Sequence, residues 1–145
     1  MREILFRGKS TETNQWIYGG FHIWEKRQTC LGDDKLKDDE ISCVITVNSF
    51  ADWNMPRTMQ AVEVIADTVG QYTGLTDRNG NKIFEGDIVN ILTENEEIGV
   101  IVYEDGGFIV HADKFSIDII YKINRTDVEV IGNKYDNPKL MEIQE

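Results

Sequence analysis

The residues with the strongest chemical potential lie close together, in a segment rich in acidic, amide and glycine residues. The first three ligand positions of an EF-hand calcium loop are matched by Asp77, Asn79 and Asn81. The pattern fails further on, because the sixth position needs glycine and is Lys82, and the twelfth needs a bidentate carboxylate and is Ile88. The segment instead predicts an Asn79-Gly80 turn between two extended segments, and no divalent metal site.

Two other patterns in this segment could carry chemistry. Glu85 and Asp87 lie two residues apart, so on a strand they share one face and could act as a carboxylate pair. The same spacing is typical of a solvent-facing rim, and Asp87 is also placed to accept hydrogen bonds from neighbouring loop amides. Gly70 and Gly74 form no phosphate loop, since no lysine and hydroxyl pair completes the pattern.

The remaining catalytic residue types are isolated. Neither His22 nor His111 has a second ligand at metal-binding spacing. Cys30 and Cys43 form no CxxC pair and are interpreted as free thiols in a reducing compartment. No serine lies in a nucleophile elbow. The sequence therefore predicts no catalytic, cofactor-binding or metal-binding residue.

The charge balance limits the kinds of molecule that the protein could bind directly. The 145 residues carry 26 acidic and 15 basic side chains, a net charge of −11, which argues against nucleic acid and anionic lipid as direct partners. The excess is uneven, with 9 acidic and 8 basic residues in 1–60 and 17 acidic and 7 basic in 61–145. An acidic second half could attract a basic protein. Without a signal sequence or an apolar run near the ~20 residues of a membrane span, the chain is predicted to be cytoplasmic.

The elements that must position these residues are mainly strands. Strand composition is found over 4–6, 16–18, 21–24, 42–47, 58–66, 82–92, 99–104, 108–112, 117–123 and 128–131. Gly8 is expected to end the first strand, and Gly19-Gly20 predicts a bulge or bend. Asp105-Gly106-Gly107 predicts a tight hairpin turn, and residues 139–145 predict a short helix. Short strands at close spacing indicate a small barrel or sandwich.

The aromatic residues suggest an interface. Trp16, Trp24 and Trp53 could stack on bases, but without a basic groove they are interpreted as core or subunit-interface residues. A bent strand at Gly19-Gly20 would offer an edge for pairing. The candidate interface residues are Trp16, Tyr18, Phe21 and Trp24.

Several ordered motifs resemble the YopX family of phage and prophage proteins. They are Thr68-Val69-Gly70-Gln71-Tyr72-Thr73-Gly74-Leu75, Glu85-Gly86-Asp87-Ile88-Val89 and Glu129-Val130-Ile131-Gly132-Asn133. The sequence departs from the family pattern at Ala66, where proline is frequent, and at Lys134, where an apolar residue is usual. The structural signature residues are Gly70, Tyr72, Gly74, Asp77, Gly80, Gly86, Asp87, Gly132 and Asn133.

The resemblance implies a fold and an assembly but no reaction. It implies a single YopX-like domain over 1–145, with N-terminal strands and loop additions in 1–66 and an SH3-like β-barrel in 67–145. Extended or short helical additions, a homo-oligomer and a bacterial host are implied as well. Because SH3-like barrels serve many unrelated roles, the fold alone predicts no activity.

Three functional hypotheses follow. The leading one is a non-enzymatic phage interaction protein that binds a protein partner through its acidic face, which could mimic nucleic acid. The alternative is an accessory factor of phage replication or recombination that contacts nucleic acid through the near-neutral first part of the chain. Its contact residues would be Arg2, Arg7, Lys9, Lys26 and Arg27, beside Trp16 and Trp24. A hydrolase built on Glu85 and Asp87 is the third hypothesis.

Overall fold

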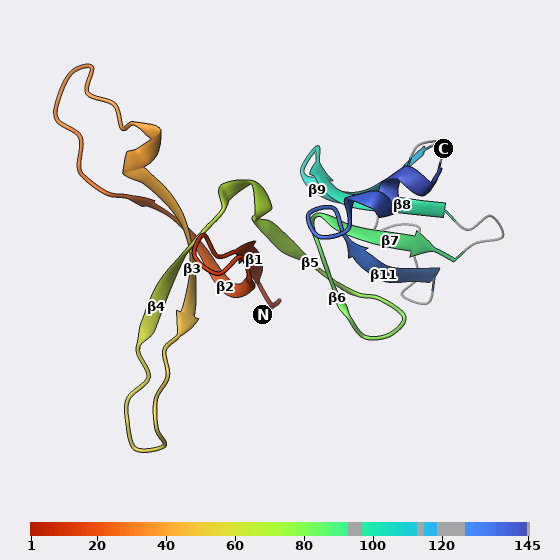
Figure 1. Ribbon diagram of the computed structural model, residues 1–145, viewed down its shortest axis with the longest axis horizontal. Coiled ribbons are helices and arrows are strands. Elements are labelled where there is room, and N and C mark those ends of the chain that lie inside the picture. Colours follow the sequence, from red (N-terminus) through yellow and green to blue (C-terminus); the bar gives the residue numbers. More distant parts are fainter. Residues whose placement is uncertain (93–96, 113–114, 119–126, 145) are drawn as a thin grey trace. The chain divides into compact units, whose positions relative to one another are not determined.

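The computed structural model describes residues 1–92, 97–112, 115–118 and 127–144, which form strands, turns and short 3₁₀ helices (Figure 1). The predicted mainly β class is confirmed. The chain folds as two compact units, whereas the resemblance implies one domain divided after residue 66. The N-terminal unit is Ile4–Val69, and the C-terminal unit combines Gly70–Glu145 with Met1–Glu3.

The N-terminal unit consists of antiparallel strands that neighbour one another in chain order. They are β1 (Phe6–Lys9), β2 (Trp16–Glu25), β3 (Ile41–Asn48) and β4 (Met59–Val64). The sheet curls, because Ser10 after β1 forms a bridge with Val64 at the end of β4. Two short 3₁₀ helices, η1 (Asp38–Glu40) and η2 (Ala66–Thr68), lie in the connections.

The glycines of this unit allow close packing and do not interrupt the strands, which corrects two predictions. β1 continues through Gly8, where a Cβ would lie 3.0 Å from Val64. β2 runs unbroken through Gly19 and Gly20, and its pairing shows no register shift there. A Cβ at Gly19 would lie 2.0 Å from the Thr46 carbonyl oxygen, so only glycine fits beside β3.

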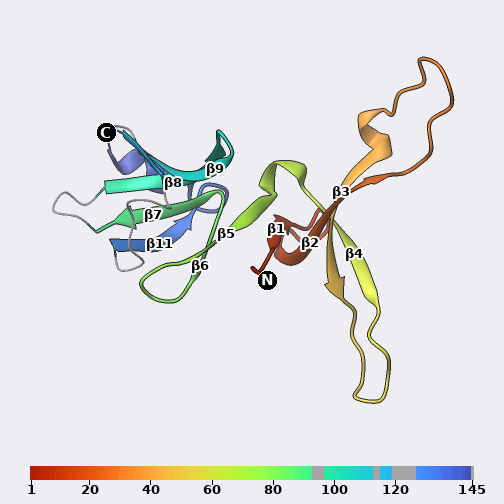
Figure 2. The same cartoon turned by 180° about the vertical axis from the view of Figure 1, so that it is seen from behind.

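The C-terminal unit contains a hairpin and a five-stranded antiparallel sheet (Figure 2). The hairpin strands are β5 (Gly70–Thr76) and β6 (Lys82–Phe84). The sheet has the order β10 (Phe115–Asp118), β9 (Gly107–Ala112), β8 (Glu97–Glu104), β7 (Asp87–Ile91) and β11 (Val128–Asn133). The predicted C-terminal helix is present as η4 (Pro138–Gln144). The expected strand over 117–123 falls partly on 119–126, outside the described residues.

The turns of this unit follow local chemistry, with one correction. Asp105 and Gly106 have φ values of 50° and 80°, which gives the predicted hairpin turn between β8 and β9. The strand expected over 82–92 is broken into β6 and β7 at Glu85-Gly86. Gly86 has φ of 89°, a left-handed conformation that ends the extended run.

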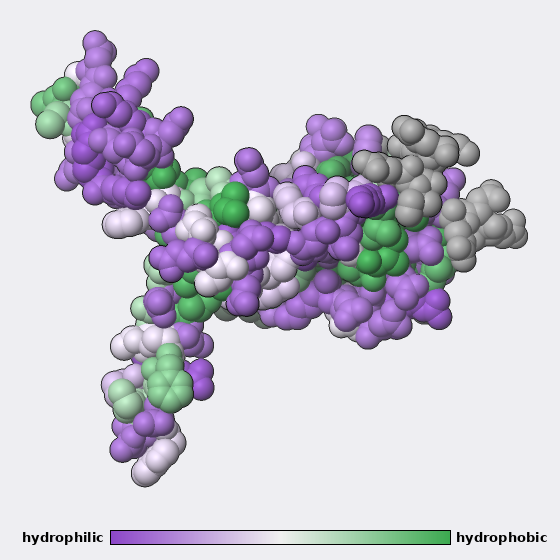
Figure 3. Space-filling view, in the orientation of Figure 1, coloured by the Kyte–Doolittle hydropathy of each residue, from purple (hydrophilic) through white to green (hydrophobic). Residues whose placement is uncertain are grey.

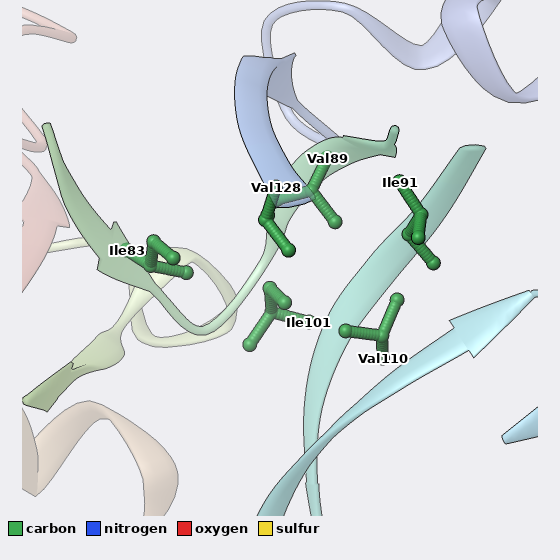
Figure 4. Close-up of a cluster of buried hydrophobic side chains, with 6 residues drawn as sticks. All are labelled: Ile83, Val89, Ile91, Ile101, Val110 and Val128. Carbon is green, nitrogen blue, oxygen red and sulfur yellow. The ribbon is translucent and has the colours of Figure 1, made fainter. Parts of the chain in front are cut away.

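The core of the C-terminal unit is aliphatic (Figure 4). The hairpin and the sheet both contribute to it, through Ile83, Val89, Ile91, Ile101, Val110 and Val128. Burying one such side chain contributes about 1.5–3 kcal/mol, so this cluster is the main source of stability in the unit. Among the described strands neither sheet closes on itself, so the SH3-like barrel is not confirmed.

Candidate protein-interaction surface

Asp77 organises the turn between β5 and β6. Its carboxylate is 3% exposed, and its Oδ1 accepts the backbone N–H of Asn79 at 2.9 Å and that of Asn81 at 2.8 Å. Its Oδ2 accepts the N–H of Val130 in β11 at 3.0 Å. Gly80 has φ of 83°, as expected for the Asn79-Gly80 turn. The carboxylate thus links the β5–β6 hairpin to the sheet. The three residues at the calcium-ligand positions, Asp77, Asn79 and Asn81, are hydrogen-bonded to one another.

The pKa of Asp77 reflects these contacts. Burial alone would raise the pKa of the carboxyl group, because desolvation disfavours its charge. The N–H groups of Val130, Asn81 and Asn79 and the side-chain amide of Asn81 outweigh burial and lower the pKa below its ordinary value. Asp77 is therefore an ionised structural residue, since it lacks the raised pKa of a general acid.

Asp87 and Gly86 organise the next turn in a similar way. Asp87 is 2% exposed, and its Oδ2 accepts the backbone N–H of Phe84 at 2.7 Å. The N–H of Gly86 donates to the carbonyl of Ile101 at 2.8 Å, and its carbonyl accepts the N–H of Lys134 at 3.0 Å. The carboxylate that the hydrolase hypothesis requires is thus buried in the fold and bonded to backbone.

The other signature residues also have structural roles. Asn133 Oδ1 accepts the N–H groups of Tyr135 at 3.1 Å and Asp136 at 2.9 Å, which closes the turn after β11. A Cβ at Gly132 would lie 2.6 Å from Asn137 Oδ1. The remaining three are Gly70, where a Cβ would lie 2.5 Å from the Glu85 carbonyl oxygen, Gly74, with φ of 88°, and Tyr72, whose ring lies 5.6 Å from that of Phe84.

The predicted aromatic interface on β2 is not one surface. Successive residues of a strand point to opposite faces, so Phe21 faces away from Trp16, Tyr18 and Trp24. Phe21 packs on Phe6, with ring centroids 5.4 Å apart. Tyr18 and Trp24 are 48% and 51% exposed, and both are available to a partner.

The basic residues of the nucleic-acid hypothesis are largely engaged inside the N-terminal unit. Arg7 is 5% exposed and lies 4.5 Å from the centroid of the Trp16 ring, and Lys9 lies 5.4 Å from the same ring. Arg27 forms ion pairs with Asp34 and Glu40, each at 2.9 Å.

The β2–β3 hairpin extends beyond its neighbours as a first arm, residues 23–42. β1 pairs only with residues 16–19 of β2, and β4 pairs only with residues 43–48 of β3. The strand ends at Trp24–Glu25 and Ile41–Ser42 therefore pair only with one another. This two-stranded ribbon leaves apolar side chains exposed on both faces, namely Ile23 at 54%, Trp24 at 51% and Ile41 at 39%, with Leu31 at 101% in the loop.

The β3–β4 hairpin ends in a second arm, residues 49–58, which leaves the opposite end of β3 (Figures 1 and 2). The Ser49 N–H donates to the Thr58 carbonyl at 2.9 Å, and their hydroxyl groups are also hydrogen-bonded. Figure 3 shows apolar patches on this arm, whereas the loop of the first arm is mainly hydrophilic. The exposed residues are Phe50 at 89%, Trp53 at 96% and Met55 at 54%, with Met59 at 77% at the base.

Sequence reasoning missed this arm, because residues 48–57 follow no strand or helix pattern and include Pro56. One feature of the sequence nevertheless indicates an exposed apolar loop here. Phe50, Trp53 and Met55 gather within a segment of turn-forming residues between two strands, where no core can form around them.

Comparison with known proteins decides the family. The YopX family, described as "YopX protein", matches residues 5–142. The chain belongs to the YopX family. It is 27% identical over 133 residues to the SPbeta prophage-derived uncharacterized protein YopX of Bacillus subtilis strain 168, covering 84% of this chain and 95% of that protein. The crystal structure of protein EF1440 from Enterococcus faecalis has the same fold, with a TM-score of 0.53 and 23% identity over 97% of this chain and 99% of that one.

Two further kinds of site are not found in the described part of this YopX protein. Within residues 1–92, 97–112, 115–118 and 127–144, no three His, Cys, Asp or Glu side chains are grouped as a metal ion would require. In the same part of the chain, no helix is long and apolar enough to cross a membrane. The surface features described above are the charge and the exposed apolar side chains of the two arms.

Proposed function

We propose that this YopX protein is a non-enzymatic, prophage-encoded interaction protein that binds a basic protein partner through its acidic C-terminal unit. The supporting observation is how the carboxylates of that unit are used. Asp77 and Asp87 are buried and accept hydrogen bonds from the backbone, whereas several other carboxylates of the unit lie at or near the surface. They include Glu85, Glu97, Glu104, Asp105, Glu129 and Asp136.

The charge is concentrated in this unit. By sequence, the C-terminal unit carries 16 acidic and 8 basic residues, while the N-terminal unit carries 10 and 7. A surface of one sign steers a partner of the opposite sign and repels nucleic acid. The engagement of Arg7 and Arg27 with internal partners also disfavours the accessory-factor hypothesis.

The test is affinity capture from host cells that carry the prophage. We expect the intact protein to retain a basic protein that elutes as salt is raised, because screening weakens exposed charge pairs. The double variant Glu104→Gln, Asp105→Asn should retain several-fold less of the basic protein. The matched control removes two exposed acids of the N-terminal unit, Asp38→Asn with Asp39→Asn, and should leave capture unchanged.

Capture of a neutral or acidic protein with no salt dependence would contradict the proposal. A shift of DNA in a gel titration at low salt, without any captured protein, would favour the accessory-factor hypothesis instead.

We also propose that the C-terminal unit is an opened form of an SH3-like barrel. In support, Leu75 of the β5–β6 hairpin packs against the core that Ile101 and Val110 of the sheet help to build. A hairpin folded onto a sheet over one core is the arrangement from which a small barrel closes. NMR contacts between the side chain of Leu75 and those of Ile101 or Val110 would support this arrangement, and their absence would contradict it.

Self-association is proposed as well. The exposed apolar area on the arms exceeds what scattered surface residues of a monomer present, so burial in a homo-oligomer would be favourable. Light scattering coupled to gel filtration at tens of micromolar measures it directly. A monomer mass at both low and high salt would contradict it.

A further inference from the structure

We infer that the second arm of one copy, residues 49–58, docks on the first arm of another copy, residues 23–42. This inference rests on the proposed self-association and names the surfaces that mediate it. It replaces the aromatic interface predicted on β2, whose residues lie on opposite faces of the strand.

The second arm displays its apolar residues without using them in the fold. Phe50 and Trp53 are 89% and 96% exposed, so they contribute almost nothing to the stability of their own chain. The arm is nevertheless ordered at both ends. The Ser49 N–H donates to the Thr58 carbonyl at the base, and the Met55 N–H donates to the Asp52 carbonyl at 3.0 Å near the tip. An ordered loop that exposes large apolar side chains loses little entropy when it binds.

Charge favours a second copy as the occupant. Residues 49–58 carry only Asp52 and Arg57, a net charge of zero, so two strongly acidic chains can meet here without like-charge repulsion. An anionic membrane would instead repel a chain of net charge −11. The first arm supplies the complementary apolar surface on one face of its two-stranded ribbon, through Ile23 and Ile41, with Leu31 in its loop.

The aromatic side chains of the second arm offer a large apolar area. A fully exposed aromatic side chain offers about 150–250 Å², so Phe50 and Trp53 together offer about 400 Å². A matching area on the receiving arm brings one contact to about 800 Å², the size of a weak interface, and each copy can make two such contacts.

The position of the arms allows each copy to make two contacts. β3 begins at the first arm and ends at the second, so the two arms leave opposite ends of the N-terminal unit. Each copy can therefore donate one arm and receive another, which doubles the buried area per copy. In each head-to-tail contact the second arm of one copy meets the first arm of another, and two copies can make this contact reciprocally or several copies can make it in series.

The experiment uses two double variants of the full chain, measured by light scattering coupled to gel filtration. The donor variant is Phe50→Ser with Trp53→Ser, and the receiver variant is Ile23→Ser with Ile41→Ser. We expect each variant to be monomeric by itself. Mixed in equal amounts, they should form a 1:1 heterodimer and nothing larger, because one intact donor arm meets one intact receiver arm.

Matched controls separate docking from folding. Ile4→Ser with Ile65→Ser removes two exposed apolar side chains of the same unit outside the arms, 56% and 39% exposed, and should keep the oligomer mass of the unaltered protein. The far-ultraviolet circular dichroism of the donor variant should match that of its parent, since the replaced side chains are not buried within their own chain.

The outcomes distinguish the two proposals. A monomeric unaltered protein overturns self-association and this inference together. An unaltered oligomer whose donor and receiver variants keep the same mass overturns the arm docking alone. Variants that are monomeric separately and stay monomeric when mixed overturn the head-to-tail contact.

Discussion

The two units use their distinctive residues in opposite ways. In the C-terminal unit the signature residues lie in turns or at tightly packed strand positions and have structural roles. Asp77 and Asp87, for example, are buried and accept hydrogen bonds from backbone N–H groups. In the N-terminal unit the large apolar residues of the arms lie at exposed hairpin ends. The motifs that identify the family therefore report on folding, and the less patterned segments carry the surface available for binding.

The difference has an energetic basis. A buried carboxylate is stable only when donors surround it, so its neighbours in sequence and space are tightly constrained. An exposed loop residue such as Trp53 makes few contacts within the fold, so folding does not restrict its type. Its type can instead be determined by the molecule that the loop binds. Substitutions in the two regions should accordingly have very different effects on the free energy of unfolding.

The largest contrast is expected between Ile101→Ala and Trp53→Ala. Ile101 is fully buried, so its truncation should lower the free energy of unfolding by about 3–4 kcal/mol, from lost burial and the cavity left behind. Trp53 is 96% exposed within its own chain, so at concentrations where the protein is monomeric its truncation should change that energy by less than about 0.5 kcal/mol. Urea unfolding followed by far-ultraviolet circular dichroism measures both. Equal losses for the two variants would break the comparison.

A smaller effect is expected at the Asn79-Gly80 turn. Gly80 has φ of 83° and open space around its Cα, so a substitution there meets backbone strain and no collision. Gly80→Val should lower the free energy of unfolding by about 1–2 kcal/mol, since β-branched residues are disfavoured in the left-handed region. Gly80→Asn is the matched control and should lose less, because asparagine adopts this conformation more readily. Thermal unfolding of the two variants provides the measurement, and a Val variant as stable as its parent would contradict the turn.

What the sequence predicted well was local. The Asn79-Gly80 and Asp105-Gly106 turns follow from which residues adopt positive φ, a preference of single residues. The features that the sequence did not predict depend on residues that become neighbours only in the folded structure. Gly19 is needed because Thr46 of β3 lies beside it, and no local pattern around Gly19 records that contact.

The two arms are a second feature that depends on contacts between segments distant in the sequence. The composition of residues 23–42 and 49–58 is compatible with any loop, and their exposure follows from where β1 and β4 stop pairing. Strand ends are set by register and by the neighbouring strands, which a single sequence does not reveal. The candidate interaction surface could therefore not be predicted as a surface, although several of its residues could be named.

The smallest effect concerns the ion pairs within the first arm, and it tests whether this arm is ordered. Hydrogen bonds from the Arg27 side chain, and next the backbone N–H of Cys30, lower the pKa of Asp34 to about 2. Because the folded pKa lies below the unfolded one, near 3.9, the ion pair contributes fully above about pH 4 and its contribution is lost as pH falls toward 2. At pH 3 about nine tenths of Asp34 should still be ionised. An NMR titration of the Cys30 amide, which donates to Asp34 at 2.7 Å, follows this directly. Arg27→Gln should move the midpoint up toward 4 and Lys26→Gln should leave it in place, whereas a midpoint near 4 in the unaltered protein would show that the first arm is not held by this pair.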